Sequence, residues 1–132
     1  MGYKAKAEKE SSSTEVKYSM FIGRWQPLHK GHLWLINQRL KEGKRVWLAI
    51  RDVEPDEKNP WTAEEILDMV HEGELKDLIL DGRVMASIIP DIESINYGRG
   101  VGYDVIEHQP PKEIGDISAT SIREQMKKDG KL

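Results

Sequence analysis

The stretch that most constrains the fold is residues 18–32, with the sequence YSMFIGRWQPLHKGH. An apolar run leads into Gly23, and after a loop containing arginine and proline a helical apolar pattern begins at Leu33. This order predicts a buried strand, a loop and the start of a helix. Such a junction turns backbone N–H groups and the positive end of a helix dipole toward one point. The stretch therefore predicts an anion site, for which phosphate is the natural ligand.

Along the rest of the chain, apolar strand patterns alternate with helical ones. The predicted strands cover residues 16–22, 45–51 and 84–89, and the predicted helices cover residues 31–42, the segment from the N-cap Thr62 to Gly73, and residues 74–80. A strand, a helix and a strand in succession require a right-handed parallel crossover. The alternation predicts an α/β fold: a Rossmann-like, doubly wound parallel sheet in a single three-layer α/β/α domain.

Both ends of the chain carry different signals. Residues 1–15 are polar and charged, so we expect them to be a disordered tail ahead of a domain that spans residues 16–132. After the third strand the pattern weakens, and residues 103–107 are expected to form a further strand. A last helix is predicted to open at residues 117–123 and to stop near the Asp-Gly pair at 129–130.

Composition excludes several classes of protein. The formal net charge is −3 with 33% charged residues, which gives no support for a nucleic-acid binder or an anionic-membrane binder. Cysteine is absent, so disulfides, thiolate nucleophiles and cysteine-ligated zinc are excluded. No apolar run has the length of a membrane span or the character of a signal peptide. A cytoplasmic protein with a small anionic ligand is the expectation.

The first constellation of chemical interest is the His-Lys-Gly-His segment. Gly31 lets backbone and ligand approach closely, and His32 lies near the amino end of the predicted helix, so both His29 and His32 can face one phosphate. The alternative is an exposed pair of loop histidines. Zinc is a weaker alternative, because two ligands are too few and neither His71 nor His108 has a helpful spacing.

The second constellation is the start of the last helix. Ser118, Thr120 and Ser121 supply hydroxyl groups there, as N-cap residues do. Arg123 lies in the first or second turn, where a cation opposes the helix dipole unless an anion lies beside it. The alternative is an ordinary N-cap with a solvent-facing arginine. Taken with the first constellation, this helix start predicts a second contact for the far phosphates of a triphosphate.

These two segments carry a family resemblance. Residues 23–32, GRWQPLHKGH, and residues 117–123, ISATSIR, resemble the HxGH signature and the C-terminal ISxTxxR-type signature of the nucleotidyltransferase superfamily. The Gly-Arg-aromatic-Gln-Pro opening and residues 59–65, NPWTAEE, are similar to archaeal-type nicotinamide mononucleotide adenylyltransferases. The short region between residues 89 and 117 is closer to glycerol-phosphate cytidylyltransferases, and Glu65 departs from the adenylyltransferase pattern.

The resemblance implies transfer of a nucleoside monophosphate from a nucleoside triphosphate, with ATP favoured, to a small phosphorylated acceptor such as nicotinamide mononucleotide, with release of pyrophosphate. A cytidylyltransferase that uses CTP and a small phosphorylated alcohol is one alternative, and a non-catalytic nucleotide-binding module is another. Mg²⁺ is expected to be held through substrate phosphates and waters rather than by protein ligands. A homo-oligomer formed through a sheet edge or a helix face is also an expectation.

The resemblance assigns roles to individual residues. His29, His32 and Arg123 are the expected catalytic residues, since they would stabilise charge on the reacting phosphates. The expected nucleotide-binding residues are Gly23, Arg24, His29, His32, Ser118, Thr120, Ser121 and Arg123. Weaker candidates for the acceptor side are Lys58, Trp61, Tyr97 and Arg99.

Overall fold

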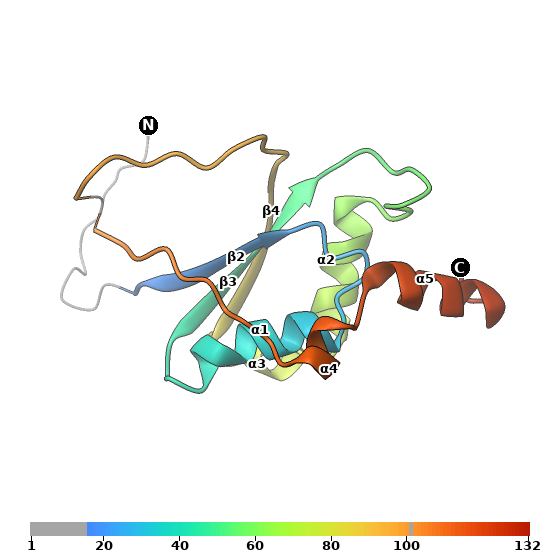
Figure 1. The fold of residues 1–132 in the computed structure, drawn as a ribbon, viewed down its shortest axis with the longest axis horizontal. Helices are drawn as coiled ribbons and strands as arrows, with labels where there is room; N and C mark the ends of the chain where they lie inside the picture. Colours follow the sequence, from blue (N-terminus) through green and yellow to red (C-terminus); the bar gives the residue numbers. More distant parts are fainter. Residues whose placement is uncertain (1–15, 101) are drawn as a thin grey trace.

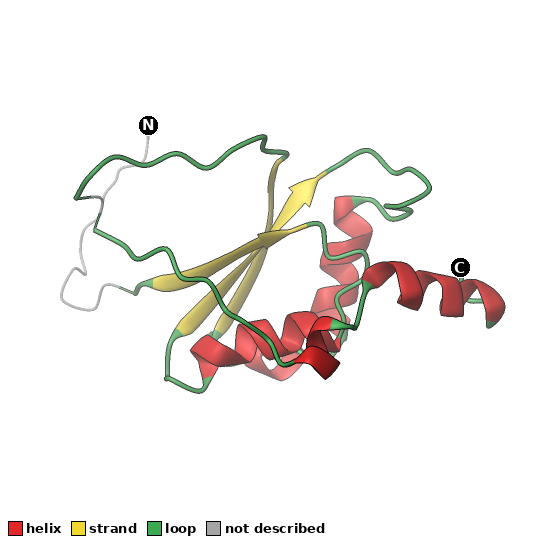
Figure 2. Ribbon diagram, in the orientation of Figure 1, coloured by secondary structure: helices red, strands yellow, loops and turns green. Residues whose placement is uncertain are grey.

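The computed structural model describes residues 16–100 and 102–132, so the predicted tail lies outside the described residues. Its regular elements are β2 (Tyr18–Gly23), α1 (Lys30–Leu40), β3 (Arg45–Asp52), α2 (Ala63–Glu72), α3 (Lys76–Leu80), β4 (Val84–Pro90), α4 (Lys112–Gly115) and α5 (Ala119–Lys128) (Figures 1 and 2). Among the helices described, none is long and apolar enough to cross a membrane.

The strands form one parallel sheet in the order β2-β3-β4. Its register places Phe21 beside Leu48, and Leu48 beside Ala86. Right-handed crossovers that step in one direction place α1 and α2 on the same face of the sheet, as Figure 1 shows. The predicted Rossmann-like parallel α/β class is therefore confirmed, whereas the described residues do not form the second helical layer expected of a doubly wound, three-layer domain, because both crossovers return on one face. The described helices cover one face, and the opposite face carries Met20 and Met85, which are 43% and 39% exposed.

The core lies between that covered face and the helices. Every second residue of the central strand β3 points toward the helices. These residues are Val46, Leu48 and Ile50, and each is 0% exposed. The helices bury Ile36 and Leu40 from α1, and Ile66 and Val70 from α2. Because β3 is flanked by a strand on both sides, its apolar run is longer and more deeply buried than those of its neighbours.

The start of α2 shows why a helix begins where the sequence predicts. The Thr62 hydroxyl accepts from the Glu65 backbone N–H at 3.1 Å, and Glu65 Oε1 accepts from the Thr62 N–H at 2.8 Å. This reciprocal capping box satisfies two N–H groups that have no partner within the helix. The predicted N-cap at Thr62 is confirmed.

Two predictions for the segment after β4 need correction. The strand expected over residues 103–107 is wrong, because that stretch is irregular and Val105 is 72% exposed. A strand needs a second strand to pair with. In addition, Gly100 and Gly102 adopt φ values of +68° and +83°, which turn the chain away from an extended conformation just before this stretch. The sequence reasoning also missed α4, whose four residues give too short a pattern to detect.

Replacing Leu48 by alanine tests the assignment of the core. The variant removes a fully buried side chain at the centre of the sheet, so we expect the free energy of unfolding to fall by about 3 kcal/mol in urea denaturation. Leu80→Ala is the matched control, because Leu80 is 75% exposed at the end of α3. A control loss as large as that of Leu48→Ala would contradict this core.

Candidate active site

The loop after β2 is held down by Trp25. Its indole Nε1 donates to the Ala49 carbonyl oxygen of β3 at 3.0 Å, and the side chain is 7% exposed. Trp25 has a φ of +54°, an unusual backbone conformation for a bulky residue. A Cβ atom at Gly23 would lie 2.9 Å from the indole, so the strand must end in glycine for the ring to occupy this position. The loop geometry therefore depends on the Gly23–Trp25 pair.

The two histidines form a stacked pair at the amino end of α1. Their ring centroids are 3.7 Å apart with an interplanar angle of 20°, and the edge of Trp25 packs against His32 at 4.7 Å. His29 Nδ1 accepts from the Gly31 backbone N–H at 3.0 Å, and His32 Nδ1 accepts from the His29 backbone N–H at 3.2 Å. Both Nδ1 atoms are thus hydrogen-bond acceptors, which leaves the proton of each neutral ring on Nε2.

The environment keeps both rings neutral at pH 7. Burial, and to a smaller extent the neighbouring His29, lowers the pKa of His32 from 6.5 to about 4. Burial also lowers the pKa of His29. The positive amino end of α1 also disfavours the charged imidazolium form, which likewise lowers the pKa of both rings. Each ring is therefore a fixed, uncharged N–H donor, and the backbone has determined which nitrogen donates.

Gly31 is required by the packing of this pair. A Cβ atom built on Gly31 would lie 2.8 Å from His29 Cε1 and 3.1 Å from His29 Nδ1, which is too close for any other residue without moving the ring. The glycine between the histidines was expected to allow close approach of a ligand. The structure adds that it allows close approach of the first imidazole to the helix backbone.

The start of α5 lies beside the same loop. Arg123 Nη1 donates to the Gln26 carbonyl oxygen at 2.6 Å, a contact across 97 positions of sequence, and Nη2 donates to the Thr120 hydroxyl at 3.3 Å. Ser118 caps the helix by accepting from the Ser121 backbone N–H at 3.1 Å. The structure thus brings Arg123 and the hydroxyl cluster together with the loop that precedes His29.

Gln26 is a residue whose role the sequence reasoning missed. Its side chain is 4% exposed, and its amide pairs with the backbone of Trp61: Nε2 donates to the carbonyl oxygen at 3.0 Å, and Oε1 accepts from the N–H at 3.2 Å. Gln26 therefore ties the loop after β3 to the loop after β2. The only signal in the sequence is its place inside the first motif.

The remaining candidates are placed in two regions. The loop after β3 carries Lys58 and Trp61, and it is folded around Asp56, whose Oδ1 accepts from the backbone N–H groups of Asn59 and Lys58 at 2.7 and 2.8 Å. The Asn59 N–H is the main reason why the pKa of Asp56 is lowered, and Arg24 contributes in the same direction. Arg24 is exposed beside this loop.

Tyr97 and Arg99 are not brought to the histidines. Both lie in the irregular segment after β4, and Tyr97 is 65% exposed. Figure 1 draws the part of this segment near residue 100 at the end of the molecule away from α5. Their acceptor-side role stays a prediction that receives no support from this geometry.

A cavity of about 560 Å³ opens beside both motifs. The first motif contributes His29 and Lys30 to its lining, and the second contributes Ile117 and Ile122. Most of the wall is apolar, with Ile66 and other residues of α2 forming one side. The cavity has the size of a small-molecule site, and polar groups lie at its edge.

The described residues do not offer a protein-held metal site. Within residues 16–100 and 102–132, no group of three or more His, Cys, Asp or Glu side chains is placed to hold a metal ion. The stacked histidines use both Nδ1 atoms on backbone N–H groups, which leaves them as donors rather than ligands.

Comparison with known proteins now adds to this geometry. Residues 20–83 match the cytidylyltransferase-like family model, a segment that includes both histidines. The match covers just under half of the chain, so the chain is similar to this family over residues 20–83. The second motif lies outside the matched segment, so its link to the superfamily depends on its sequence resemblance and on the Arg123–Gln26 contact.

Three matches show which proteins this chain is similar to. A nicotinamide-nucleotide adenylyltransferase of Caldivirga maquilingensis is 35% identical over 57% of this chain and 43% of its own length. A nicotinamide-nucleotide adenylyltransferase of Thermococcus kodakarensis is 28% identical over 84% of this chain and 73% of its own length. A crystal structure of a bifunctional NMN adenylyltransferase/ADP ribose pyrophosphatase from Francisella tularensis is 34% identical over 58% of this chain and 23% of that chain, with a TM-score of 0.46. The chain spans less than half the length of the first of these relatives.

The histidine pair makes a prediction for NMR. At pH 7 the nitrogen-15 spectrum of His32 should show a neutral ring protonated on Nε2, and the ring should titrate with a pKa of about 4. His32→Gln removes that resonance and so assigns it. Titration near 6.5, or a proton on Nδ1, would contradict the hydrogen bonds that determine the tautomer.

The same shift makes a prediction for stability. The unfolded ring binds a proton near pH 6.5 while the folded ring resists it, so the free energy of unfolding should fall as the pH drops from 6.5 toward 4. His32→Gln should lose part of that pH dependence, measured as the change in urea midpoint between pH 7 and pH 5. An identical pH dependence in both proteins would contradict the prediction.

Proposed function

We propose that this chain transfers a nucleoside monophosphate, with ATP favoured as its source, to a small phosphorylated acceptor such as nicotinamide mononucleotide, and releases pyrophosphate. The single observation that carries the proposal is the stacked pair His29 and His32, with both Nε2–H groups oriented by backbone hydrogen bonds at the start of α1. The names of the relatives, nicotinamide-nucleotide adenylyltransferases, support the choice of donor and acceptor.

The reaction needs little acid–base chemistry. An oxygen of the acceptor phosphate attacks the α-phosphorus, a new P–O bond forms, and the bond to the bridging oxygen of the β-phosphate breaks. The attacking oxygen is already anionic, so no proton must be removed from it. The rate then depends on alignment and on stabilising charge on the phosphoryl centre and the departing pyrophosphate.

The neutral histidines suit this task. Their Nε2–H groups donate to oxygens of the α- and β-phosphates without moving a proton, and the amino end of α1 adds its positive dipole. Arg123 and the hydroxyls of Ser118 and Thr120 supply the contacts for the β- and γ-phosphates from the second helix start. Gly23 and Arg24 lie at the start of the same loop, and Gly23 leaves room for the Trp25 indole.

Mg²⁺ accompanies the triphosphate in this proposal, held by phosphate oxygens and waters, because the described side chains do not form a metal site. The acceptor side is formed by the loop after β3, where Gln26 fixes the backbone of Trp61 and Lys58 is exposed. The Trp61 side chain is partly buried against the core, and its exposed part would stack on a ring of the acceptor.

The test of the proposed function is pyrophosphate release in the presence of Mg²⁺. ATP and CTP are each combined with nicotinamide mononucleotide, glycerol 3-phosphate and phosphocholine. Release with ATP and nicotinamide mononucleotide is the expected result. Release only with CTP and a phosphorylated alcohol would replace the proposal by cytidylyl transfer, and triphosphate binding without release from any pair would replace it by a nucleotide-binding module.

His32→Ala should lower turnover by about a hundredfold, the usual cost of removing one preorganised electrostatic donor. His71→Ala is the matched control, because His71 lies exposed on α2 with its ring nitrogen against the Leu67 carbonyl. Steady-state pyrophosphate assays on both variants give the comparison. Equal turnover in the two variants would remove His32 from the mechanism.

Arg123→Ala should weaken triphosphate binding by about tenfold or more, since a charge-assisted contact is lost. Isothermal calorimetry gives the dissociation constant directly. Lys127→Ala, in the exposed last turn of α5, is the control for general loss of positive charge. If both variants bind triphosphate like the parent protein, Arg123 is an ordinary helix arginine bonded to the Gln26 carbonyl.

A further inference from the structure

The outer edge of β4 carries backbone groups that face away from the sheet. The Val46 N–H donates to the Arg83 carbonyl oxygen at 2.9 Å, so the peptide groups of residue 83 and of every second residue after it face β3. The N–H groups of Val84, Ala86 and Ile88 therefore point outward. In the part of the chain that the structure describes, no strand pairs with this edge.

The edge lacks the features that keep strands from pairing. The sequence of β4 is VMASIIP, which contains no charged residue, and its proline stands at the last position. The other edge strand, β2, has the returning chain beside its second half: His108 stacks on Phe21, which packs against the core, with ring centroids 6.2 Å apart. Of the two edges, β4 is the one open to another strand.

We propose that β4 pairs with β4 of a second copy of this chain, antiparallel, about a two-fold axis that passes beside Ser87. In this register the Ala86 N–H donates to the Ile88 carbonyl of the second copy, and the Ile88 N–H donates to its Ala86 carbonyl. The Val84 N–H reaches the Pro90 carbonyl. All outward N–H groups of both strands are then satisfied, and the missing N–H of Pro90 falls at the end of the ladder.

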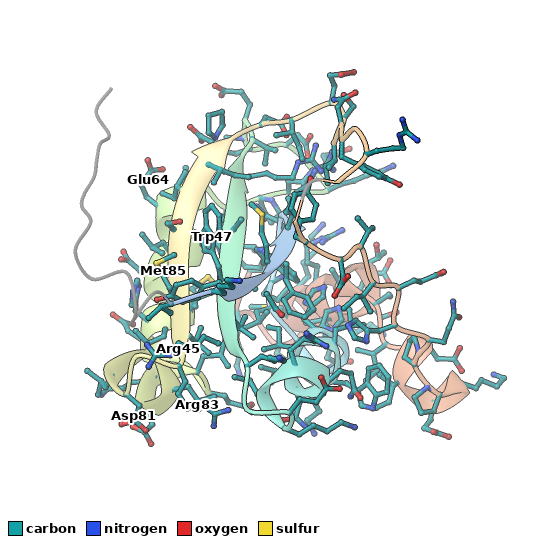
Figure 3. All side chains as sticks on the ribbon, turned by 90° about the vertical axis from the view of Figure 1, so that its left-hand side faces the viewer. Arg45, Trp47, Glu64, Asp81, Arg83 and Met85 are labelled. Carbon is teal, nitrogen blue, oxygen red and sulfur yellow. The ribbon has the colours of Figure 1, made fainter. Side chains whose placement is uncertain are left out.

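The side chains favour the same register. Met85 lies opposite Ile89 of the second copy on the face of the sheet that the helices leave open, and Trp47 lies beside Met85 on the adjacent strand (Figure 3). Met85 is 39% exposed, so pairing removes apolar surface from water. Each copy would contribute the same two apolar side chains, Met85 and Ile89, as a two-fold contact requires.

Charge is compatible with the antiparallel direction. Asp91 pairs with Arg51 of its own copy at 2.8 Å, and Arg83 Nη2 donates to the Leu40 carbonyl oxygen of its own copy at 2.6 Å, so a contact between copies would add to these bonds. Arg83 and Asp91 stand four positions on either side of Ser87, so the axis places Arg83 of one copy opposite Asp91 of the other. Figure 3 shows Arg45 and Arg83 together with Asp81 at the amino end of the strands, and Glu64 toward the other end. An antiparallel pair therefore brings the end of each copy that holds Arg45, Arg83 and Asp81 beside the end that holds Glu64 and Asp91.

A single cysteine tests the register, because the chain has no cysteine of its own. In Ser87→Cys the two thiols would face each other in a non-hydrogen-bonded pair, with Cα atoms about 4.5 Å apart, which suits a disulfide. In the control Met85→Cys the two thiols belong to residues about 13 Å apart across the axis. We expect oxidation to produce a covalent dimer for Ser87→Cys alone; equal cross-linking, or none in either variant, would overturn the register.

The contact itself is tested by sedimentation over a wide range of concentration. We expect the parent protein to dimerise and Met85→Lys to raise the dimer dissociation constant by about tenfold or more, since a buried ammonium replaces an apolar pair. Met20→Lys is the matched control: Met20 is 43% exposed on the same face but on β2. A monomeric parent protein would overturn the proposal. Equal weakening by both variants would show that the sheet faces, rather than the β4 edges, make the contact.

Discussion

The hydrogen bond from the Trp25 indole to the Ala49 carbonyl is the constraint on which the site depends. It fixes a loop residue with positive φ to the buried central strand, and Gly23 makes room for the ring. With Trp25 in place, its edge supports His32, and the His29 backbone N–H reaches His32 Nδ1. The position of both imidazoles therefore follows from packing of the core rather than from the flexible part of the loop.

Neutral histidines at this position resolve an electrostatic conflict. Two imidazolium rings stacked at 3.7 Å would repel each other, would be poorly solvated, and would oppose the positive end of α1. The protein instead uses uncharged rings whose tautomer is set by two backbone N–H groups. Positive charge comes from Arg123, which lies on a separate helix beside the same loop. The histidines thus supply hydrogen-bond donors of fixed orientation, and Arg123 supplies the positive charge.

The sequence predicted the elements that depend on local residue patterns, but it did not predict the features that depend on contacts between distant segments. The strands and α1, α2 and α5 follow from apolar periodicity and from caps such as Thr62, which act within a few residues. The predicted strand at residues 103–107 is wrong because its composition could not reveal that no neighbouring strand would be available. The histidines and Arg123 were recognised as candidates. The tautomer of each ring follows from backbone N–H groups two and three residues away, which no sequence pattern reports. The role of Gln26 arises only when it meets Trp61, 35 positions along the chain.

The order of the strands separates the proposed chemistry from the proposed assembly. The loops that hold the histidines and Trp61 follow β2 and β3, while β4 lies at the far edge with β3 between it and β2. A second copy added at β4 extends the sheet away from the His29 loop, so it needs no residue of that site. The open face beside Trp47 and Met85 also becomes continuous across the two copies. Loss of the β4 contact should accordingly leave the hydrogen bonds around His29 and His32 intact.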